Sequence, residues 1–374
     1  MANNPLQALH AAGQSIWLDY IDRTMLRNGE LTRRIAGDAL TGMTSNPTIF
    51  EKALAQGTAY DDQLRDAAGE RTAWELFELV ETDDVRAACD IFRGSYDAAQ
   101  GADGFVSIEV SPGAAHDARA TIAEAHRLWT TVDRPNVMIK VPGTDEGALA
   151  LRQLIADGIN VNVTLLFAVD AHARIIDAYL AGLEDRVKTG SGVSRVASVA
   201  SFFVSRVDTE VDKRLERIGT PQAKALGGLA AVANAKIAYA LFRERFAGPR
   251  WAALVAKGAR VQRPLWASTG TKNPAYSDVK YVETLVGPDT VNTLPPATLD
   301  AFRDHGAVAR TVDADVPGAR GALRALSSAG VDLRDVTDQL LAEGLASFQK
   351  SFDTLIAGLE LKARTLGRNL VAAK

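Results

Sequence analysis

The chain has 374 residues, of which 47% are hydrophobic and 24% charged, and these proportions are typical of a globular protein with a buried core. The formal net charge of −4 at pH 7 argues against a general affinity for nucleic acid or for an anionic membrane surface. Cys89 is the only cysteine, which excludes an intrachain disulfide and a cysteine-based metal cluster.

The first ten residues do not combine a basic segment with an apolar core, so we expect no secretory signal. No segment approaches the roughly 18 uninterrupted apolar residues that a membrane span needs. We therefore expect a cytoplasmic protein without membrane contact. His116 and His126 do not have the i, i+4 spacing of a zinc-binding pair, and the other histidines are scattered, so no metal site is expected.

Eight short apolar segments, each typical of a β-strand, follow one another along the chain. They cover residues 15–19, 40–45, 105–110, 137–141, 159–165, 196–203, 264–268 and 290–294. The fourth is apolar on both faces except for Lys140, and Pro142 and Gly143 end it. Such a strand is typical of a parallel sheet that is covered on both sides.

Segments with helical spacing of apolar residues fill the gaps between these strands. They cover about 69–99, 118–132, 151–155, 170–183, 221–246, 281–286 and 336–364. Asp170 is placed to cap the helix that it begins, and Pro221 is expected to open one long alanine-rich helix to about Phe246.

The alternation of strands and helices predicts an α/β fold, a (β/α)8 TIM barrel with additional helices. An open, doubly wound sheet is the alternative, but no Gly-x-Gly-x-x-Gly follows any strand. No linker marks a second domain, so we expect residues 1–374 to form a single domain. We expect the C-terminal helix to pack on the barrel rather than at an oligomer contact.

In such a barrel the active site lies at the C-terminal ends of the strands. Charged, hydroxyl and amide residues occur there in the predicted strands or directly after them. They are Asp19, Thr44, Asn46, Glu109, Lys140, Asn162, Thr164, Ser201, Arg206 and Lys272.

Most of these residues also have a structural interpretation. Lys140 could be the buried partner of a carboxylate, and Glu109 could form a structural ion pair with a neighbouring lysine. Asp19 could cap the following helix, and Thr44 and Asn46 could form a turn before Pro47. Asn162 could satisfy buried backbone groups.

Two further residues have structural alternatives of the same kind. Arg206 could lie on a solvated helix face, and Lys272 could belong to an ordinary turn within 270–274. The residues taken together are harder to explain structurally. A buried amine can attack a ketone and form an imine, a carboxylate can move the proton of a sugar hydroxyl, and cationic groups can hold a phosphate.

Seven segments, in order along nearly the whole chain, resemble transaldolases. They are residues 17–19, 42–50, 106–110, 137–144, 159–167, 200–207 and 266–274, which include Met-Ile-Lys-Val-Pro-Gly-Thr around Lys140. Each segment is short, but the ordered series is specific. The resemblance implies a (β/α)8 barrel with a Schiff-base lysine on the fourth strand.

The resemblance also implies roles for individual residues. Lys140 matches the Schiff-base lysine and Asp19 the acid–base aspartate. Glu109 matches a glutamate that works with a catalytic water, and Thr164 a threonine that helps to hold this water. The positions that match sugar-contacting and phosphate-binding residues are Thr44, Asn46, Asn162, Ser201 and Arg206.

The chain departs from the family pattern after the seventh strand. Shorter family members have an arginine there that contacts the phosphate, and Lys272 is our candidate for its substitute. The segments 221–263 and 317–374 resemble the longer bacterial form, and we assign them no catalytic role.

The resemblance implies transfer of a dihydroxyacetone unit from sedoheptulose 7-phosphate or fructose 6-phosphate to glyceraldehyde 3-phosphate or erythrose 4-phosphate. This is the non-oxidative pentose phosphate reaction, and no metal or organic cofactor is expected because the imine supplies the electron sink. We expect sugar phosphates as partners, no nucleic acid, and a monomer or homodimer. The alternatives are a Schiff-base aldolase that releases dihydroxyacetone, and a catalytically silent barrel that binds a sugar phosphate or a protein.

Overall fold

The computed structural model describes residues 4–67, 69 and 71–367. Its eight parallel strands close into a barrel in the order in which they follow one another along the chain. The strands are β1 (Gln14–Asp19), β2 (Leu40–Thr44), β3 (Phe105–Glu109), β4 (Val137–Pro142), β5 (Val161–Leu166), β6 (Ser198–Phe203), β7 (Arg263–Ala267) and β8 (Thr290–Leu294). β1 pairs with β8 from Gln14 and Thr290 onward, which closes the sheet. The predicted (β/α)8 barrel is confirmed, and the open sheet is wrong.

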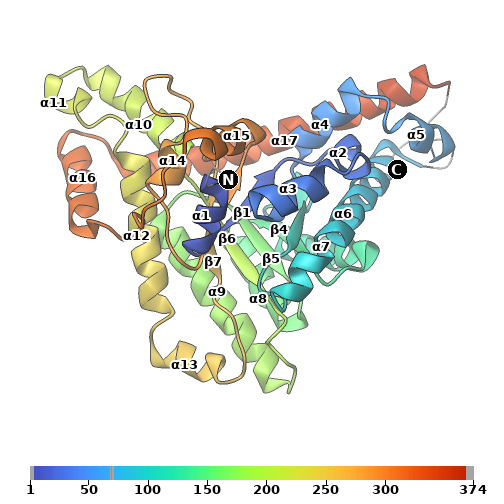
Figure 1. Ribbon diagram of the computed structural model, residues 1–374, viewed down its shortest axis with the longest axis horizontal. Helices are drawn as coiled ribbons and strands as arrows, with labels where there is room; N and C mark the ends of the chain where they lie inside the picture. The colour runs from blue at the N-terminus through green and yellow to red at the C-terminus, as the bar shows by residue number, and fades with distance from the viewer. Residues whose placement is uncertain (1–3, 68, 70, 368–374) are drawn as a thin grey trace.

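Helices surround the barrel, as Figure 1 shows. They are α1 (Pro5–Ala11), α2 (Arg23–Arg27), α3 (Glu30–Asp38), α4 (Pro47–Gln56), α5 (Asp61–Ala67), α6 (Ala73–Ala98), η2 (Pro112–Ala114), α7 (Ala118–Val132), α8 (Asp145–Asp157), α9 (Val169–Lys188), α10 (Ser205–Ile218), α11 (Pro221–Lys224), α12 (Ala230–Arg245), α13 (Pro249–Val255), α14 (Lys280–Glu283), α15 (Pro296–His305), α16 (Val316–Ser328) and α17 (Leu333–Thr365). Within the described residues, none of these helices combines the length and the apolar composition that crossing a membrane requires.

Apolar side chains fill the barrel interior towards the amino-terminal ends of the strands. Trp17, Phe105 and Met138 belong to this inner cluster and are buried. Gly42 is required beside them, because a Cβ at this position would lie 2.5 Å from the Trp17 indole. The opposite end, where the strands finish, carries the predicted site residues, as expected for a barrel whose active site lies at the carboxyl-terminal mouth.

Two helix predictions are wrong in detail. The long alanine-rich helix is interrupted, because α11 ends at Lys224 and α12 begins at Ala230. Gly228, in the interruption, has a φ of +71° and donates its N–H to Asp212 Oδ1 at 2.9 Å. Asp170 is not the cap of α9, because the cap position is Ala168 and Asp170 lies in the first turn.

The C-terminal helix α17 spans 33 residues and packs against α4, α6 and α10. Figure 1 shows it beside α4 along the upper edge of the view. Its rings pack on the helix that precedes β3, with the Phe352 and Trp74 centroids 5.1 Å apart. Polar contacts fix both ends: Arg214 of α10 donates to Gln339 at 2.6 Å, and Lys362 lies 2.9 Å from Asp61.

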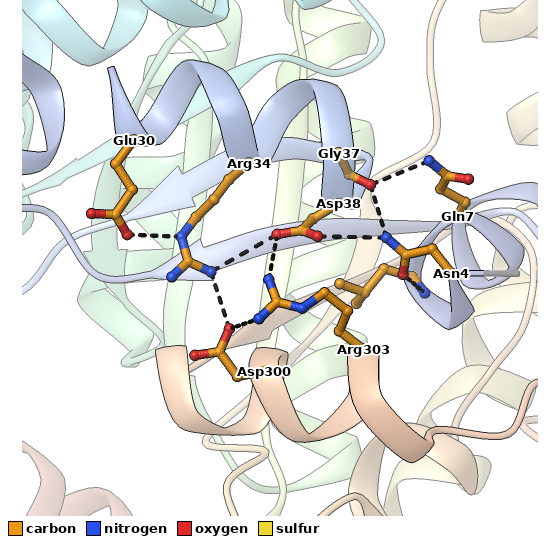
Figure 2. Close-up of polar contacts among 9 residues, drawn as sticks. Asn4, Gln7, Glu30, Arg34, Gly37, Asp38, Asp300 and Arg303 are labelled. Atoms are coloured by element: carbon orange, nitrogen blue, oxygen red, sulfur yellow. Dashed lines mark hydrogen bonds and ion pairs between the residues drawn. The ribbon is translucent and has the colours of Figure 1, made fainter. Parts of the chain in front are cut away.

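A polar cluster joins the helices that follow the first and the last barrel strands (Figure 2). Asp38, at the end of α3, is buried and lies 3.2 Å from Arg303 of α15 and 3.9 Å from Arg34. Asp300 accepts hydrogen bonds from both arginines, at 2.8 Å and 3.3 Å. Asn4 adds the chain start to the cluster by donating to Gly37 O at 2.8 Å. The cluster therefore links α3 to α15 next to the β1–β8 pair that closes the barrel.

Candidate active site

Lys140 is the centre of the polar mouth. It is buried on β4, with 7% of its surface exposed. Its Nζ donates to Glu109 Oε2 at 2.9 Å and to the backbone oxygen of Ser45 at 3.0 Å. The register of β3 and β4 places Glu109 and Lys140 side by side. The ion pair that was one interpretation of Lys140 is present, and it lies in the place where an imine-forming lysine is expected.

Asp19 lies at the end of β1 and does not cap a helix, because Asp22 caps α2. Its Oδ1 accepts a hydrogen bond from Thr44 Oγ1 at 2.8 Å, and Thr44 also lies 2.8 Å from Thr293 Oγ1. Burial raises the pKa of the Asp19 carboxyl above its ordinary value. The charge of Lys140 and the Thr44 hydrogen bond oppose this rise.

Glu109 is the second carboxyl of the mouth. Burial raises its pKa, the charge and hydrogen bond of Lys140 oppose the rise, and the charge of Asp19 adds to it. Behind it, Glu81 of α6 is buried, and burial together with the charge of Glu109 raises the pKa of Glu81 well above its ordinary value. Carboxyl groups in this surrounding accept protons more readily than exposed ones, which suits proton transfer.

Hydrogen bonds fix the amide and hydroxyl groups on the neighbouring strands. Asn162 Nδ2 donates to Ser107 Oγ at 3.0 Å, and its Oδ1 accepts from Ser201 Oγ at 2.7 Å. The partners of Asn162 are therefore side chains, not the backbone groups of the structural alternative. Thr164 is buried on β5 and pairs in register with Pro142, two residues beyond Lys140.

Asn46 and Arg206 lie at the starts of helices beside the mouth. The Asn46 oxygen accepts from Ile49 N at 3.1 Å and caps α4, so Asn46 has a structural role, as a helix cap rather than as the predicted turn former. Arg206, in the first turn of α10, is half-buried, and its guanidinium lies 5.2 Å from the centre of the Phe203 ring. Burial lowers the pKa of Arg206, while Asp19 and Glu343 of α17 oppose the change. Arg206 is therefore not on a solvated face.

Lys272 is the predicted residue that the structure does not bring into the buried cluster. It is exposed in the loop after β7, where it lines a cavity of about 650 Å³ with Lys213 and Lys224. Its charge nevertheless contributes, after that of Arg206, to lowering the pKa of Asp19. Lys272 is thus at the rim of the mouth.

Three contributors to this geometry are not among the predicted site residues. Ser107 holds Asn162, and its position two residues before Glu109 on the same strand face could have indicated it. Thr293 contacts Thr44 and lies one residue before the end of β8, but a threonine near a strand end gives no specific signal. Ser45 contributes a backbone oxygen to Lys140, which residue type does not reveal. In the described part of the chain, no three His, Cys, Asp or Glu side chains are grouped to hold a metal ion.

A comparison with protein families matches residues 16–359 to the transaldolase/fructose-6-phosphate aldolase family. The chain belongs to this family. The resemblance predicted from the seven segments is thereby confirmed, and the match extends through the segment 221–263 and most of α17.

Curated relatives in this family are similar along almost their whole length. The chain is 49% identical to the transaldolase of Frankia alni over 369 residues, 98% of this chain and 99% of that protein. It is 51% identical to the transaldolase of Thermobifida fusca over 94% of this chain and 96% of that protein. For the transaldolase of Mycolicibacterium smegmatis the identity is 50% over 95% and 97%.

Proposed function

We propose that this protein is a transaldolase, a transferase that moves a dihydroxyacetone unit between sugar phosphates through an imine on Lys140. The donors are sedoheptulose 7-phosphate or fructose 6-phosphate, and the acceptors are glyceraldehyde 3-phosphate or erythrose 4-phosphate. The observation that carries the proposal is the buried Lys140 Nζ, 2.9 Å from Glu109 in a mouth that also contains Asp19. The transaldolases of related organisms support it, because their similarity covers nearly the whole chain.

The first half of the reaction cleaves the donor. Lys140 Nζ attacks the C2 carbonyl, and the addition product loses water to form the imine. Asp19 accepts the proton of the C4 hydroxyl as the C3–C4 bond breaks and an aldose phosphate leaves. The imine takes up the electron pair of that bond, so the three-carbon unit stays on Lys140 as an enamine.

The second half reverses these steps on a different aldehyde. The enamine carbon attacks the acceptor, and Asp19 returns the proton to the new hydroxyl. A water that Glu109 and Thr164 hold then hydrolyses the imine and frees Lys140. No metal or organic cofactor has a step in this scheme.

The remaining polar groups bind the substrate in this proposal. Thr44, Asn46, Asn162 and Ser201 contact the sugar hydroxyls, because fixed hydrogen-bonding groups orient a polyol before bond cleavage. Arg206 binds the phosphate with its planar guanidinium, and Lys272 adds a second positive charge from the rim.

We also propose how the protein is organised in the cell. Residues 1–374 form a single domain in which α17 packs on the barrel, and this is supported by the contacts of α17 with α4 and α10. The protein works in the cytoplasm as a monomer or homodimer.

Borohydride trapping tests the proposed function. Reduction of the imine in the presence of fructose 6-phosphate should leave a stable covalent adduct on the wild-type protein. Mass spectrometry should detect the added mass, and peptide mapping should locate it on Lys140. Lys140→Ala should gain no mass, and Lys213→Ala, which changes an exposed lysine of α10, should gain it as the wild type does. Absence of an adduct in the wild type, or an equal adduct in Lys140→Ala, would show that the imine mechanism is wrong.

A second candidate is a fructose-6-phosphate aldolase that releases dihydroxyacetone, because the matching family includes this activity. The two activities share the imine and differ in whether an aldehyde or a proton captures the enamine. Measuring free dihydroxyacetone with and without erythrose 4-phosphate separates them. Transfer to the acceptor, with little dihydroxyacetone in its absence, supports the transaldolase.

A further inference from the structure

Strand β5 contains a bulge between Val163 and Leu166, at Thr164 and Leu165. On the β4 side the pairing is regular through Pro142 and Thr164. On the β6 side Val163 pairs with Ala200 and Leu166 pairs with Phe202, so β5 has an extra residue between these pairs. Bulges redirect side chains next to active sites and bend the strand that contains them. The direction of Thr164 therefore depends on how this bulge is held.

Leu165 is the strained residue of the bulge. Its φ is +60°, in the left-handed region that a bulky side chain rarely adopts. Such a conformation persists only when the surrounding structure over-determines it. Leu165 is buried, with 7% of its surface exposed, so the residues that pack against it must hold its conformation.

Two glycines receive the leucines that follow Thr164. Gly344 of α17 faces Leu165, because a Cβ built on Gly344 would lie 3.0 Å from Leu165 Cδ2. Gly143, after the lysine strand, faces Leu166, because a Cβ there would lie 2.4 Å from Leu166 Cδ2. Gly143 also donates its N–H to the Thr164 oxygen at 2.7 Å. The bulge is thus enclosed between the loop after Lys140 and the C-terminal helix.

Helix α17 is fixed on both sides of Gly344. Towards its start, Arg214 of α10 donates to Asp335 at 2.5 Å and to Gln339 at 2.6 Å. Towards its end, Ser351 accepts from Thr48 of α4 at 2.8 Å. A helix anchored in this way cannot easily move away from Leu165. A larger residue at 344 would therefore press on the Leu165 side chain, which must give by a few tenths of an ångström, rather than move the helix.

We propose that Gly344 is a positioning residue for the transferase reaction. By lacking a side chain it lets α17 approach Leu165, and this contact holds the bulge that directs Thr164 into the mouth. The inference rests on the proposed function, in which Thr164 helps to hold the water that acts with Glu109. It gives the C-terminal helix a part in the active site, through the backbone of β5.

The first experiment compares two glycines of the same helix. Gly344→Ala should lower kcat three- to tenfold, as a shift of a few tenths of an ångström near a catalytic group does, while KM for fructose 6-phosphate stays within about twofold. Gly358→Ala is the matched control, because a Cβ at Gly358 meets nothing within 4 Å. The control should keep the wild-type kcat. Both variants should melt near the wild-type temperature, because alanine is the better helix former.

The second experiment asks whether Gly344 acts through Thr164. In a Thr164→Ala background, adding Gly344→Ala should lower kcat by less than about 1.5-fold, because the group that the bulge positions is already absent. A further three- to tenfold loss in this background would overturn the proposal. Wild-type kcat in Gly344→Ala would also overturn it, as would equal losses in Gly344→Ala and Gly358→Ala.

Borohydride trapping on the same samples separates the two proposals. If wild-type protein forms no adduct with fructose 6-phosphate, the proposed function fails. If it forms the adduct on Lys140 and Gly344→Ala keeps full activity, only the role of Gly344 fails.

Discussion

The Asp19 carboxyl is under opposing influences that can be altered one at a time. Burial raises its pKa, and the charge of Lys140 and the Thr44 hydrogen bond oppose the rise. In the proposed reaction Asp19 must be ionised to accept the C4 hydroxyl proton. The acidic limb of the kcat–pH profile therefore reports its protonation.

Thr44→Val should move this acidic limb to higher pH. The variant removes the hydroxyl that donates to Asp19 Oδ1 at 2.8 Å, so the pKa of the carboxyl rises further and more alkaline solution is needed to ionise it. The measurement is kcat against pH with saturating substrate. Thr41→Val is the matched control, because Thr41 lies on the same strand and donates to Ile16 O at 3.3 Å. A limb that stays in place in Thr44→Val would contradict the assignment to Asp19.

His172 should make the protein less stable in mild acid. Burial on α9 lowers its pKa from 6.5 to about 4, and both ring nitrogens are buried without a hydrogen-bond partner among the described residues. Between these pH values the unfolded chain binds a proton that the folded protein excludes, so the free energy of unfolding falls as the pH decreases from 6.5 to 4.

His172→Leu removes this titration. Relative to the wild type, the variant should gain about 3 kcal/mol in the free energy of unfolding as the pH decreases across that window, the equivalent of the pKa difference. Urea unfolding at several pH values measures it. Parallel curves for the two proteins would show that His172 does not titrate as described.

Among the elements, the break between α11 and α12 is the clearest test of backbone geometry. Gly228 has a φ of +71°, and a Cβ there would lie 2.8 Å from Lys280 Nζ and from Tyr276 Cζ. Gly228→Ala should lower the free energy of unfolding by at least about 1–2 kcal/mol, which is the cost of a left-handed residue before any clash. Gly227→Ala is the control, because its φ lies outside the left-handed region. Equal losses in urea unfolding would contradict this explanation.

The same break shows where sequence patterns end. All eight strands were predicted to within about two residues at each end, because short apolar runs bounded by Gly, Pro and Asn give a strong signal. The alanine-rich composition of 221–246 hid the effect of the two adjacent glycines. The hydrogen bond from Gly228 N to Asp212 also depends on another helix, α10, which the pattern within 221–246 does not include. The bulge at Leu165 is equally hidden, because a leucine in a strand does not indicate a positive φ.

At the scale of the molecule, the Asp38 cluster should contribute to barrel closure (Figure 2). Asp38→Ala removes the buried carboxylate that Arg303 and Arg34 share, and leaves Asp300 as their common partner and Glu30 as a further partner of Arg34. It should lower the free energy of unfolding by about 1–3 kcal/mol, as loss of a buried charge partner does. Asp62→Ala removes an exposed partner of Arg65 and should cost less than about 0.5 kcal/mol. Urea unfolding compares the two. If Asp38→Ala loses no more free energy of unfolding than Asp62→Ala, the cluster does not contribute to barrel closure.

The candidate site was predictable to the extent that it follows from topology. Once eight parallel strands close in chain order, the residues at their ends must converge, and this brings Asp19, Glu109 and Lys140 to one mouth. Loop residues do not share this constraint, and Lys272 accordingly lies exposed in the loop after β7. Backbone groups such as the Ser45 oxygen are independent of residue type and needed the structure.

The contact between Lys140 and Glu109 places the proposed nucleophile in direct contact with a group that can accept and return its proton. Attack on the donor needs a neutral amine, and loss of water from the addition product needs an acid. Because Lys140 already donates to Glu109 at 2.9 Å, the proton that leaves the amine has an acceptor in contact, and burial raises the pKa of that acceptor. In the proposed reaction one proton transfer thus prepares both groups, and its reversal restores them when the imine is hydrolysed. In the proposed reaction the Lys140–Glu109 pair can therefore return to its starting protonation state at the end of each catalytic cycle.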